Sequence, residues 1–404
     1  MLLQFNFKNF KSFKDIACLD MRSTRVTELD YHIQVLNNNK ILPITGVFGN
    51  NNSGKSNLIE AVSVMKKFVV ESMLYNKNMP YQFLYNKQYL FMFNHDNDAD
   101  GTMFETVLLL ENGKKYIYGF VVTETGFKQE WLKEVKKSGK IINILIREDY
   151  ELIELKSTDT SLLNIFKTSL KKTNLVLSLG ASLNHSVLLD IYQWFTKVNI
   201  INNQTNSRLD ENMQIMSCIN DFSIYDTLLQ VLRDIDGTDI QKIFMKGREI
   251  YLSRIVNNQT IEYPFILESD GFKKIVLLFY QVYNSLKNGE ILFIDNLSDY
   301  VHQLIIRLLI IMFTDPENNI NHSQLIFTSH NTYFLQNDLL RRDEIWFTEK
   351  SNNNISELFS LVEFKNADKT TVRKDLNYET NYLLGRFGAI PFSNTHSDIS
   401  KYHI

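Results

Sequence analysis

The sequence predicts an α/β fold in which a mixed, largely parallel sheet is combined with an antiparallel β meander and a helical insertion. Three observations support this prediction. Residues 44–60, ITGVFGNNNSGKSNLIE, pass from an apolar strand through a glycine-containing loop into a helix. Residues 91–157 contain short apolar runs separated by Asn-Gly and Thr-Gly turns, which is typical of a meander. From residue 265 onward, helical patterns alternate with short, fully apolar strands, as in a parallel sheet.

The predicted elements follow in order along the chain. Leu3, Phe5 and Phe7 alternate with polar residues and predict an opening strand, and a turn and a second strand come next. The helix after the glycine-containing loop is expected to begin at Lys55, because its apolar residues recur at spacings of three and four. The later elements are helices within 158–235, strands near 242–245 and 250–256, a helix at 271–286, strands at 291–294 and 325–328, a helix at 301–313 and an edge strand at 344–347.

The parallel core is therefore predicted to be split by the meander and the insertion. This order divides the chain into five parts, which differ in their hydrophobic pattern. Residues 1–90 begin the core, 91–157 form the meander, 158–240 form the helical insertion or lid, 241–365 complete the core and 366–404 form a C-terminal tail.

Composition indicates an ordinary folded chain. Of 404 residues, 44% are apolar and 22% are charged, and the net charge of −3 provides no overall basic field for nucleic acid. Cys18 and Cys218 are far apart and lack metal-ligand spacing, which indicates a reducing compartment. The opening residues lack the apolar core of a signal peptide, and the most apolar run, 304–313, is too short to span a bilayer. We therefore expect a cytoplasmic protein without membrane contact.

The loop within residues 44–60 fits the spacing G-x-x-x-x-G-K-[ST] of a phosphate-binding loop. A loop that wraps phosphates has to expose consecutive backbone N–H groups, and side chains near its glycines would block the approach. The helix that follows directs its positive end at the same anion. Lys55 is expected to reach the outer phosphates, and the Ser56 hydroxyl to bind Mg²⁺. The predicted binding residues are Gly49, Asn50, Asn51, Asn52, Ser53, Gly54, Lys55, Ser56 and Asn57.

Three further stretches carry residues that phosphoryl chemistry requires. The apolar strand 291–294 is followed by Asp295, which is expected to hold the metal at the carboxyl edge of the sheet. Ser269 and Gly271 open an earlier helix, and on their own they are only a helix start with Ser269 as N-cap. His330 follows the next apolar strand, where a histidine is on its own often structural. Together with the phosphate loop, these stretches indicate one composite nucleotide site.

The order of phosphate loop, Ser-x-Gly helix, strand ending in Asp and strand ending in His resembles the ABC-type ATPases of the SMC and DNA-repair kind. The segments FKNFKSFKD, FETVLLLENGKKYIYGF, DEIWFTEKSNNNISELFSL and NYLLGRFGAIP are similar to the RloA-like group of AAA-type ATPases, relatives of the overcoming-lysogenization-defect (OLD) ATPases. The similar segments lie near both ends of the chain and in the meander, and the helical insertion is the part with the least similarity. It implies an ABC-type P-loop NTPase head that binds ATP and Mg²⁺.

The resemblance also implies how the site works. Two heads form a homodimer, or part of a larger homo-oligomer, by sandwiching ATP between them. Ser269 and Gly271 of one head would face the γ-phosphate that Lys55 of the other head holds. His330 would sense that phosphate.

One position departs from the family pattern. The family places a Glu directly after the strand-ending Asp to activate water, and this position is Asn296 here. An amide can hydrogen-bond a water but cannot take its proton, and loss of a general base typically costs about 10²–10⁴-fold in rate. We therefore expect ATP binding and head pairing with slow hydrolysis. Asp299 is a nearby carboxylate, but its spacing does not favour it as the replacement base.

Smaller assignments accompany the site. The sequence lacks the N-K-x-D motif of guanine recognition, so ATP is expected rather than GTP. Gln82 and Gln88 are both candidates for the family's glutamine loop, and the sequence does not separate them. His302 stands where the family often has a histidine, and we interpret it as structural.

The leading functional interpretation is a nucleotide-dependent sensor or scaffold for a separate effector in prokaryotic anti-phage defence. The resemblance motivates it, because RloA-like ATPases are commonly partnered with a nuclease subunit. Full-length OLD enzymes carry a TOPRIM nuclease after the ATPase, whereas the residues after His330 lack paired carboxylates at strand ends. A nuclease would therefore be supplied in trans.

Two alternatives stay open. A repair or recombination ATPase that clamps duplex DNA would use clusters of lysines, which on their own are more often solvated faces. A small-molecule P-loop kinase is disfavoured by the long separation of Lys55 from Asp295 and by the Ser-x-Gly and His stretches. The lysine clusters are Lys133, Lys136, Lys137 and Lys140, and Lys167, Lys171 and Lys172.

Overall fold

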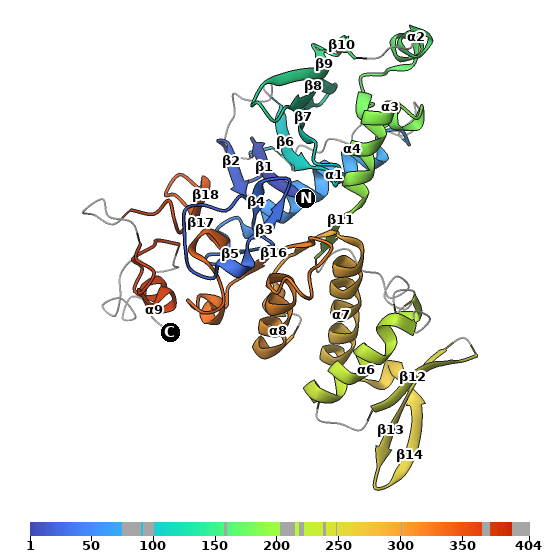
Figure 1. Cartoon of the computed structure of the whole chain (residues 1–404), viewed down its shortest axis with the longest axis vertical. Helices are drawn as coiled ribbons and strands as arrows, with labels where there is room; N and C mark the ends of the chain where they lie inside the picture. The colour runs from blue at the N-terminus through green and yellow to red at the C-terminus, as the bar shows by residue number, and fades with distance from the viewer. Residues whose placement is uncertain are drawn as a thin grey trace, which may run out of the picture.

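Helix α1 (Lys55–Glu71) packs against two separate sheets and joins them (Figure 1). On one side, the Phe68 ring contacts the rings of Phe104 and Phe120 in the first sheet. On the other side, the helix shares its apolar cluster with Phe293 of the second sheet. The computed structural model describes residues 1–74, 90–91, 101–156, 160–202, 215–217, 222–236, 240–247, 249–299, 301–365 and 372–389.

The first sheet is antiparallel and contains the predicted meander. Its seven strands lie in the order β10-β9-β8-β7-β6-β1-β2, so the opening strands extend the meander rather than the parallel core. Phe5 and Phe7 alternate with polar residues and are buried on one face, and Phe7 pairs with Phe104 across β1 and β6. The strands are β1 (Leu2–Lys8), β2 (Ala17–Asp20), β6 (Thr102–Leu109), β7 (Lys115–Thr123), β8 (Gly126–Val135), β9 (Ile141–Glu148) and β10 (Glu151–Leu155).

The second sheet is the predicted parallel core. Its strands lie in the order β11-β15-β16-β5-β17-β18, and only β18 is antiparallel. Strands β5 and β15 are buried along their whole length, which explains their continuous apolar runs. The expectation that β17 is an edge strand is wrong, because β18 pairs along its outer side. The strands are β11 (Val198–Ile201), β15 (Ile291–Ile294), β16 (Gln324–Ser329), β5 (Ile44–Phe48), β17 (Ile345–Lys350) and β18 (Ser356–Ser360).

The range 158–240 is not a purely helical insertion. Strand β11 lies inside this range and pairs in parallel with β15, so it belongs to the core sheet. Helices α3 and α4 pack beside α1, whereas α6 packs with a three-stranded sheet on the far side of α7 (Figure 1). The sequence predicts only two strands of this small sheet. The third strand, β14, is mostly polar and exposed, so it has no apolar pattern that would predict a strand. These elements are α2 (Thr160–Ser169), α3 (Val176–Ser182), α4 (Ser186–Thr196), α6 (Phe222–Asp236), β12 (Ile240–Lys246), β13 (Glu249–Val256) and β14 (Gln259–Pro264).

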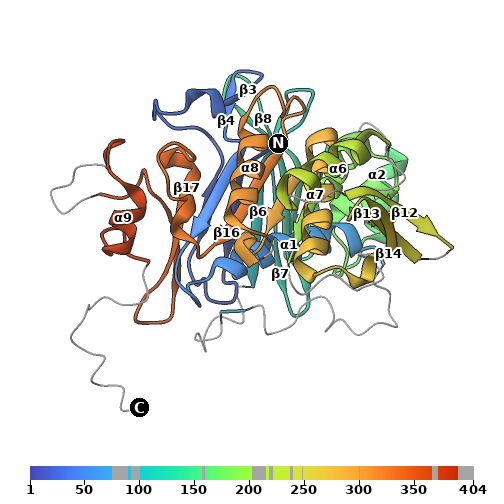
Figure 2. The same ribbon diagram turned by 90° about the horizontal axis from the view of Figure 1, so that it is seen from below.

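Helices α7 (Asp270–Asn288) and α8 (Gln303–Thr314) cover the face of the core sheet that α1 does not cover (Figure 2). Because side chains alternate along a strand, Phe293 of β15 joins the α1 cluster while Leu292 joins the cluster of α7 and α8. His302 accepts a hydrogen bond from the backbone N–H of Leu304 and caps α8, in line with a structural role. No helix in the described ranges is long and apolar enough to cross a membrane.

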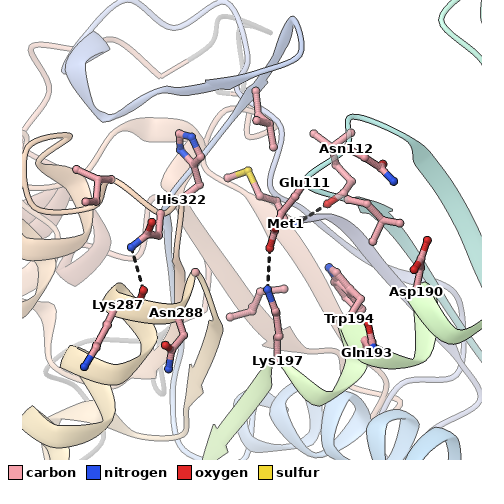
Figure 3. Close-up of a pocket in the computed structure, with 17 residues that line it drawn as sticks. Met1, Glu111, Asn112, Asp190, Gln193, Trp194, Lys197, Lys287, Asn288 and His322 are labelled. Atoms are coloured by element: carbon pink, nitrogen blue, oxygen red, sulfur yellow. Dashed lines mark hydrogen bonds and ion pairs between the residues drawn. The ribbon is translucent and has the colours of Figure 1, made fainter. Parts of the chain in front are cut away.

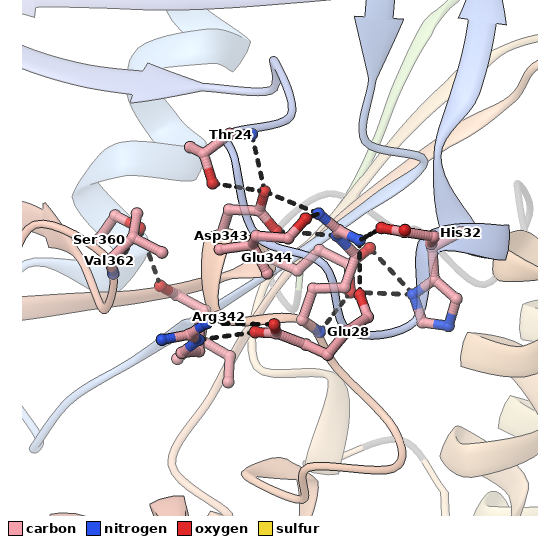
Figure 4. Close-up of polar contacts among 12 residues, drawn as sticks. Thr24, Glu28, His32, Arg342, Asp343, Glu344, Ser360 and Val362 are labelled. Atoms are coloured by element: carbon pink, nitrogen blue, oxygen red, sulfur yellow. Dashed lines mark hydrogen bonds and ion pairs between the residues drawn. The ribbon is translucent and has the colours of Figure 1, made fainter. Parts of the chain in front are cut away.

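A buried polar network anchors the start of β17 to the segment after β2 (Figure 4). Arg341 is fully buried and donates from Nε to Asp343 Oδ1 at 2.9 Å and from Nη1 to the Glu28 carbonyl at 2.6 Å. Glu344 pairs with His32 at 3.0 Å, and both side chains are buried. Burial raises the pKa of Glu344, and the His32 contact opposes that shift. Contacts between residues more than 300 positions apart therefore hold this strand in place.

Candidate nucleotide-binding site

Parallel strands bring the predicted residues to one edge of the core sheet. Strand β5 leads into the phosphate loop, β15 ends before Asp295 and β16 ends before His330. Because β16 lies between β15 and β5, His330 follows the strand between those that carry Asp295 and the loop. The carboxyl ends of parallel strands are where open α/β sheets bind ligands.

The loop requires glycine at two positions. Gly49 and Gly54 have φ angles of 152° and 116°, in a region that other residues rarely adopt. A Cβ on Gly49 would lie 2.5 Å from the Thr348 carbonyl oxygen, and one on Gly54 would lie 2.7 Å from Ser356 Oγ. Gly54 provides no side-chain cap for α1, so the first-turn N–H groups are available to an anion.

Lys55 is folded back onto its own loop. Its Nζ donates to the carbonyls of Gly49 at 2.6 Å and Asn50 at 2.7 Å, and the side chain is 9% exposed. Burial lowers the pKa of Lys55 to about 8, and the charge of Asp295 opposes this shift. The Lys55 amine is therefore hydrogen-bonded to carbonyl oxygens of its own loop. Phosphate oxygens would accept stronger, charge-assisted hydrogen bonds from the same amine.

Ser56 and Asp295 form a pair that fits a magnesium ion. Ser56 Oγ donates to Asp295 Oδ1 at 3.1 Å, and Thr328 Oγ1 donates to the same oxygen at 2.7 Å. Two neighbouring ligands of an octahedral Mg²⁺ are about 3 Å apart, because each lies about 2.1 Å from the ion. Magnesium usually takes only one or two protein ligands and completes its shell with phosphates and water. The spacing of these two oxygens therefore suits Mg²⁺ bound together with a nucleotide.

Asn296 occupies a left-handed position with φ 56° directly after Asp295. Its backbone N–H donates to Thr328 Oγ1 at 2.7 Å, and its Nδ2 donates to the Asp299 carboxylate. Its Oδ1 lies 2.9 Å from Nδ1 of His330. Both the nitrogen and the oxygen of the Asn296 side-chain amide are therefore hydrogen-bonded. The hydrogen bond between Asp299 and the Asn296 side chain was not predicted from the sequence. The available signal was the position of Asp299, three residues after Asn296. In the structure, a backbone hydrogen bond of 2.9 Å closes the turn between these two residues.

Ser269 and Gly271 are not part of this cluster within one chain. Ser269 Oγ accepts from the backbone N–H of Phe272 at 3.2 Å and caps α7. The nearest atom to a Cβ added at Gly271 is Ser269 Oγ, at 4.0 Å, so the surface there is open. Among the described residues, neither has a hydrogen bond or close contact with the phosphate loop.

Several contacts of the loop were not expected from the sequence. Ser53 Oγ hydrogen-bonds Thr348 Oγ1 of β17 at 2.6 Å. The Asn50 N–H donates to the carbonyl of Ala389 at 3.1 Å, so the segment that contains α9 (Tyr378–Leu383) reaches the loop. Asn57 donates to Ser12 Oγ at 2.7 Å, which makes it a link to the opening turn. Gln82 and Gln88 lie outside the described residues, as does Cys218.

A cavity of about 600 Å³ lies at the opposite edge of the core sheet, where its strands begin (Figure 3). Asn288 and His322 line one side of it, and Trp194 and Lys197 line the other. Lys197 pairs with Glu111 at 2.7 Å across part of this space. Residues of the phosphate loop do not line this cavity, so it is separate from the candidate nucleotide site.

A glycine loop that opens a helix, a buried lysine and a serine–aspartate pair at the carboxyl edge of a parallel sheet define a P-loop ATPase head. Residues 44–336 match the family described as "AAA domain, putative AbiEii toxin, Type IV TA system", and the chain belongs to that family. No protein with a curated description matches the chain.

Solved structures with some likeness are SMC heads. The SMC head domain from Thermotoga maritima is 13% identical, with a TM-score of 0.40 over 89% of this chain and 98% of that chain. An SMC head bound to the C-terminal winged-helix domain of ScpA is 11% identical, with a TM-score of 0.43 over 89% and 97%. A Pyrococcus furiosus head with an extended coiled coil, bound to the C-terminal domain of ScpA, is 10% identical, with a TM-score of 0.38 over 89% and 96%.

Proposed function

We propose that this chain is a cytoplasmic ATP-binding sensor or scaffold that pairs with a second copy of itself and controls a separate effector. The main support for this proposal is that one site combines the groups that bind a nucleotide with the lack of a carboxylate base at the expected position. The loop, Ser56 and Asp295 provide the groups for binding a nucleotide with Mg²⁺, whereas Asn296 stands where a carboxylate base is expected. Such a site favours long occupancy by ATP over rapid turnover.

The binding step uses groups that are already in position. Residues 49–54 would surround the phosphates with backbone N–H groups, and Lys55 would exchange its loop carbonyls for phosphate oxygens. Ser56 and Asp295 would hold Mg²⁺, which neutralises phosphate charge when bound. Thr328 orients the carboxylate of Asp295 through its hydrogen bond.

The pairing step rests on the open amino-terminal end of α7. Ser269 and Gly271 are exposed and have no hydrogen bond with the described residues of the phosphate loop in their own chain. The amino-terminal end of a helix attracts anions through its N–H groups and dipole. In the proposed homodimer, this end of one head meets the γ-phosphate held by the other head, so each site is completed by the partner copy.

The effector is proposed to be a separate protein, such as a TOPRIM-type nuclease, in anti-phage defence of the RloA-like and OLD-like kind. The sequence resemblance supports this assignment, and the family description names a putative toxin of a toxin–antitoxin system. The lysine clusters give DNA clamping less support than the effector role. Lys136 pairs with Glu134 at 2.5 Å and the Lys172 amine lies 4.6 Å from the Tyr150 ring centre, so members of both lysine clusters are engaged within the chain.

The test compares molecular mass by light scattering with and without ATP and Mg²⁺, alongside phosphate release. We expect a monomer that becomes a dimer with ATP, together with slow turnover. Lys55→Ala is the control, because it removes the phosphate partner and should stay monomeric. A wild-type chain that stays monomeric in saturating ATP would contradict the pairing model, and rapid phosphate release would contradict slow hydrolysis.

A further inference from the structure

The side chains of Asp299, Asn296 and His330 form a hydrogen-bonded chain at the nucleotide edge of the sheet. Asn296 is in the middle, with Nδ2 on the Asp299 carboxylate and Oδ1 2.9 Å from His330 Nδ1. The backbone holds this residue firmly, because its N–H donates to Thr328 at 2.7 Å and its carbonyl accepts from Asp299 N at 2.9 Å. The arrangement of these three side chains determines which nitrogen of the His330 ring carries a hydrogen.

An ionised carboxylate only accepts hydrogen bonds, so the NH₂ group of Asn296 must face Asp299. The carbonyl oxygen of the same amide must then face His330. A carbonyl oxygen also only accepts, so Nδ1 of His330 must carry a hydrogen. A neutral imidazole has a single N–H, and Nε2 therefore keeps its lone pair.

This arrangement places a proton acceptor beside the phosphate loop. His330 follows β16, between the strands that lead to the loop and to Asp295, and its side chain is exposed to solvent. A neutral ring with this tautomer cannot donate from Nε2 to a phosphate, which the role of phosphate sensor requires. It can accept a proton from water at Nε2, which is what a general base does.

We propose that His330 is the base for the slow hydrolysis of ATP, and that Asn296 and Asp299 are positioning residues that hold its tautomer. This inference rests on the proposed function. In the step, Nε2 takes a proton from water while the water oxygen bonds to the γ-phosphorus. The bond from that phosphorus to the bridging oxygen breaks, and ADP leaves with the electron pair. His330 then returns the proton to solvent.

The first test needs no nucleotide. Nitrogen-15 NMR of imidazole-labelled protein, at a pH where the ring is neutral, reports which nitrogen of His330 carries the hydrogen; the signal is assigned with His330→Gln. We expect the Nδ1–H form in the wild type, and a shift toward the Nε2–H form in Asn296→Leu, which removes the acceptor. An Nε2–H form in the wild type would overturn the proposal.

The second test separates a base from a sensor. The amide of His330→Gln can donate to a phosphate but cannot take a proton. We expect single-turnover hydrolysis to fall by about 100-fold while the Kd for ATP changes by less than about twofold. His302→Gln is the matched control, because that histidine caps α8 and lies outside the network. A His330→Gln rate within about threefold of the wild type would overturn the base role.

The role of Asp299 is tested by a conservative exchange. Asp299→Ala should lower both the hydrolysis rate and the fraction of His330 in the Nδ1–H form. Asp299→Glu keeps an acceptor-only group, so most of the rate and most of the Nδ1–H form should be retained. Equal rates and tautomers in these two variants would overturn the positioning role. Failure of the wild type to bind ATP would instead contradict the proposed function, while the tautomer measurement stands independently.

Discussion

At the scale of single residues, Lys55 combines burial with a positive charge. Its amine donates hydrogen bonds to two carbonyl oxygens of the loop, and burial lowers its pKa to about 8. Bound phosphates would favour the charged form and raise that pKa again. Nucleotide binding should therefore be linked to proton uptake in the alkaline range.

The first prediction concerns this linkage. Above the pKa of about 8, the free protein holds a neutral Lys55 that must gain a proton when ATP binds. The affinity for ATP should therefore fall with rising pH, by up to about tenfold per pH unit. Calorimetry in two buffers of different ionisation enthalpy should show proton uptake above that pKa and little below it. Lys55→Arg stays charged and should remove the pH slope, and a wild-type affinity that is independent of pH would contradict this account.

The second prediction concerns Asn296. Asn296→Glu places a carboxylate where the ATPases that the sequence resembles have a water-activating base, so phosphate release should rise by at least about tenfold. The gain should persist in the double variant with His330→Gln, because the new carboxylate no longer needs the imidazole. Single-turnover phosphate release measures both variants. An unchanged rate in Asn296→Glu would show that the missing carboxylate does not limit hydrolysis.

At the scale of elements, the network around Arg341 positions strand β17. This guanidinium is fully buried and binds Asp343, Asp30 and the backbone carbonyls of Glu28 and Val26. Strand β17 in turn contributes Thr348 to the wall of the phosphate loop. The nucleotide site therefore depends on a polar cluster formed by residues far away in the sequence.

The third prediction tests that dependence. Arg341→Ala leaves the buried Asp343 carboxylate without its ion-pair partner, and removing one member of a buried pair costs about 3–5 kcal/mol of stability. Urea unfolding monitored by tryptophan fluorescence measures the loss. Arg373→Ala is the matched control, because the Arg373–Asp375 pair is exposed and should contribute little to stability. Equal losses for both variants would contradict a structural role of the network.

At the scale of the whole molecule, the candidate site is divided between two surfaces. The phosphate loop, Ser56 and Asp295 meet at the carboxyl edge of the core sheet, whereas Ser269 and Gly271 at the start of α7 are exposed and have no hydrogen bond with the described residues of the phosphate loop. A single chain therefore does not bring all the predicted binding residues together. A second copy would complete the set.

The fourth prediction uses complementation between two defective variants. Ser269→Asp keeps a good N-cap for α7 but places a negative charge against the partner's γ-phosphate, so it should bind ATP without pairing. A mixture of Ser269→Asp and Lys55→Ala can form one intact site, from Lys55 of the first and Ser269 of the second. We expect the mixture to recover dimers and phosphate release that neither variant shows alone.

The control for complementation is Ser138→Asp, which changes an exposed serine in the β8–β9 turn and should behave as the wild type. Light scattering and phosphate release with ATP and Mg²⁺ serve for all samples. The composite-site model would be contradicted by Ser269→Asp chains that pair and turn over normally without a complementing partner.

Local patterns were sufficient for the features that depend on neighbouring residues. The sequence by itself determined the phosphate loop, the buried strand before Asp295 and the alternating strands of the meander, because hydrophobic period and glycine spacing are short-range properties. It also indicated the start of α7, because an N-cap is a local signal.

Only the tertiary structure decided the features that depend on distant partners. Strand β11 joins the core sheet, β18 covers β17, and Asp299 with Asn296 orients His330, although none of these contacts has a pattern of its own in the sequence. The physical reason is that strand pairing and side-chain networks depend on which segments meet after folding, and the pattern within one segment does not specify its neighbour.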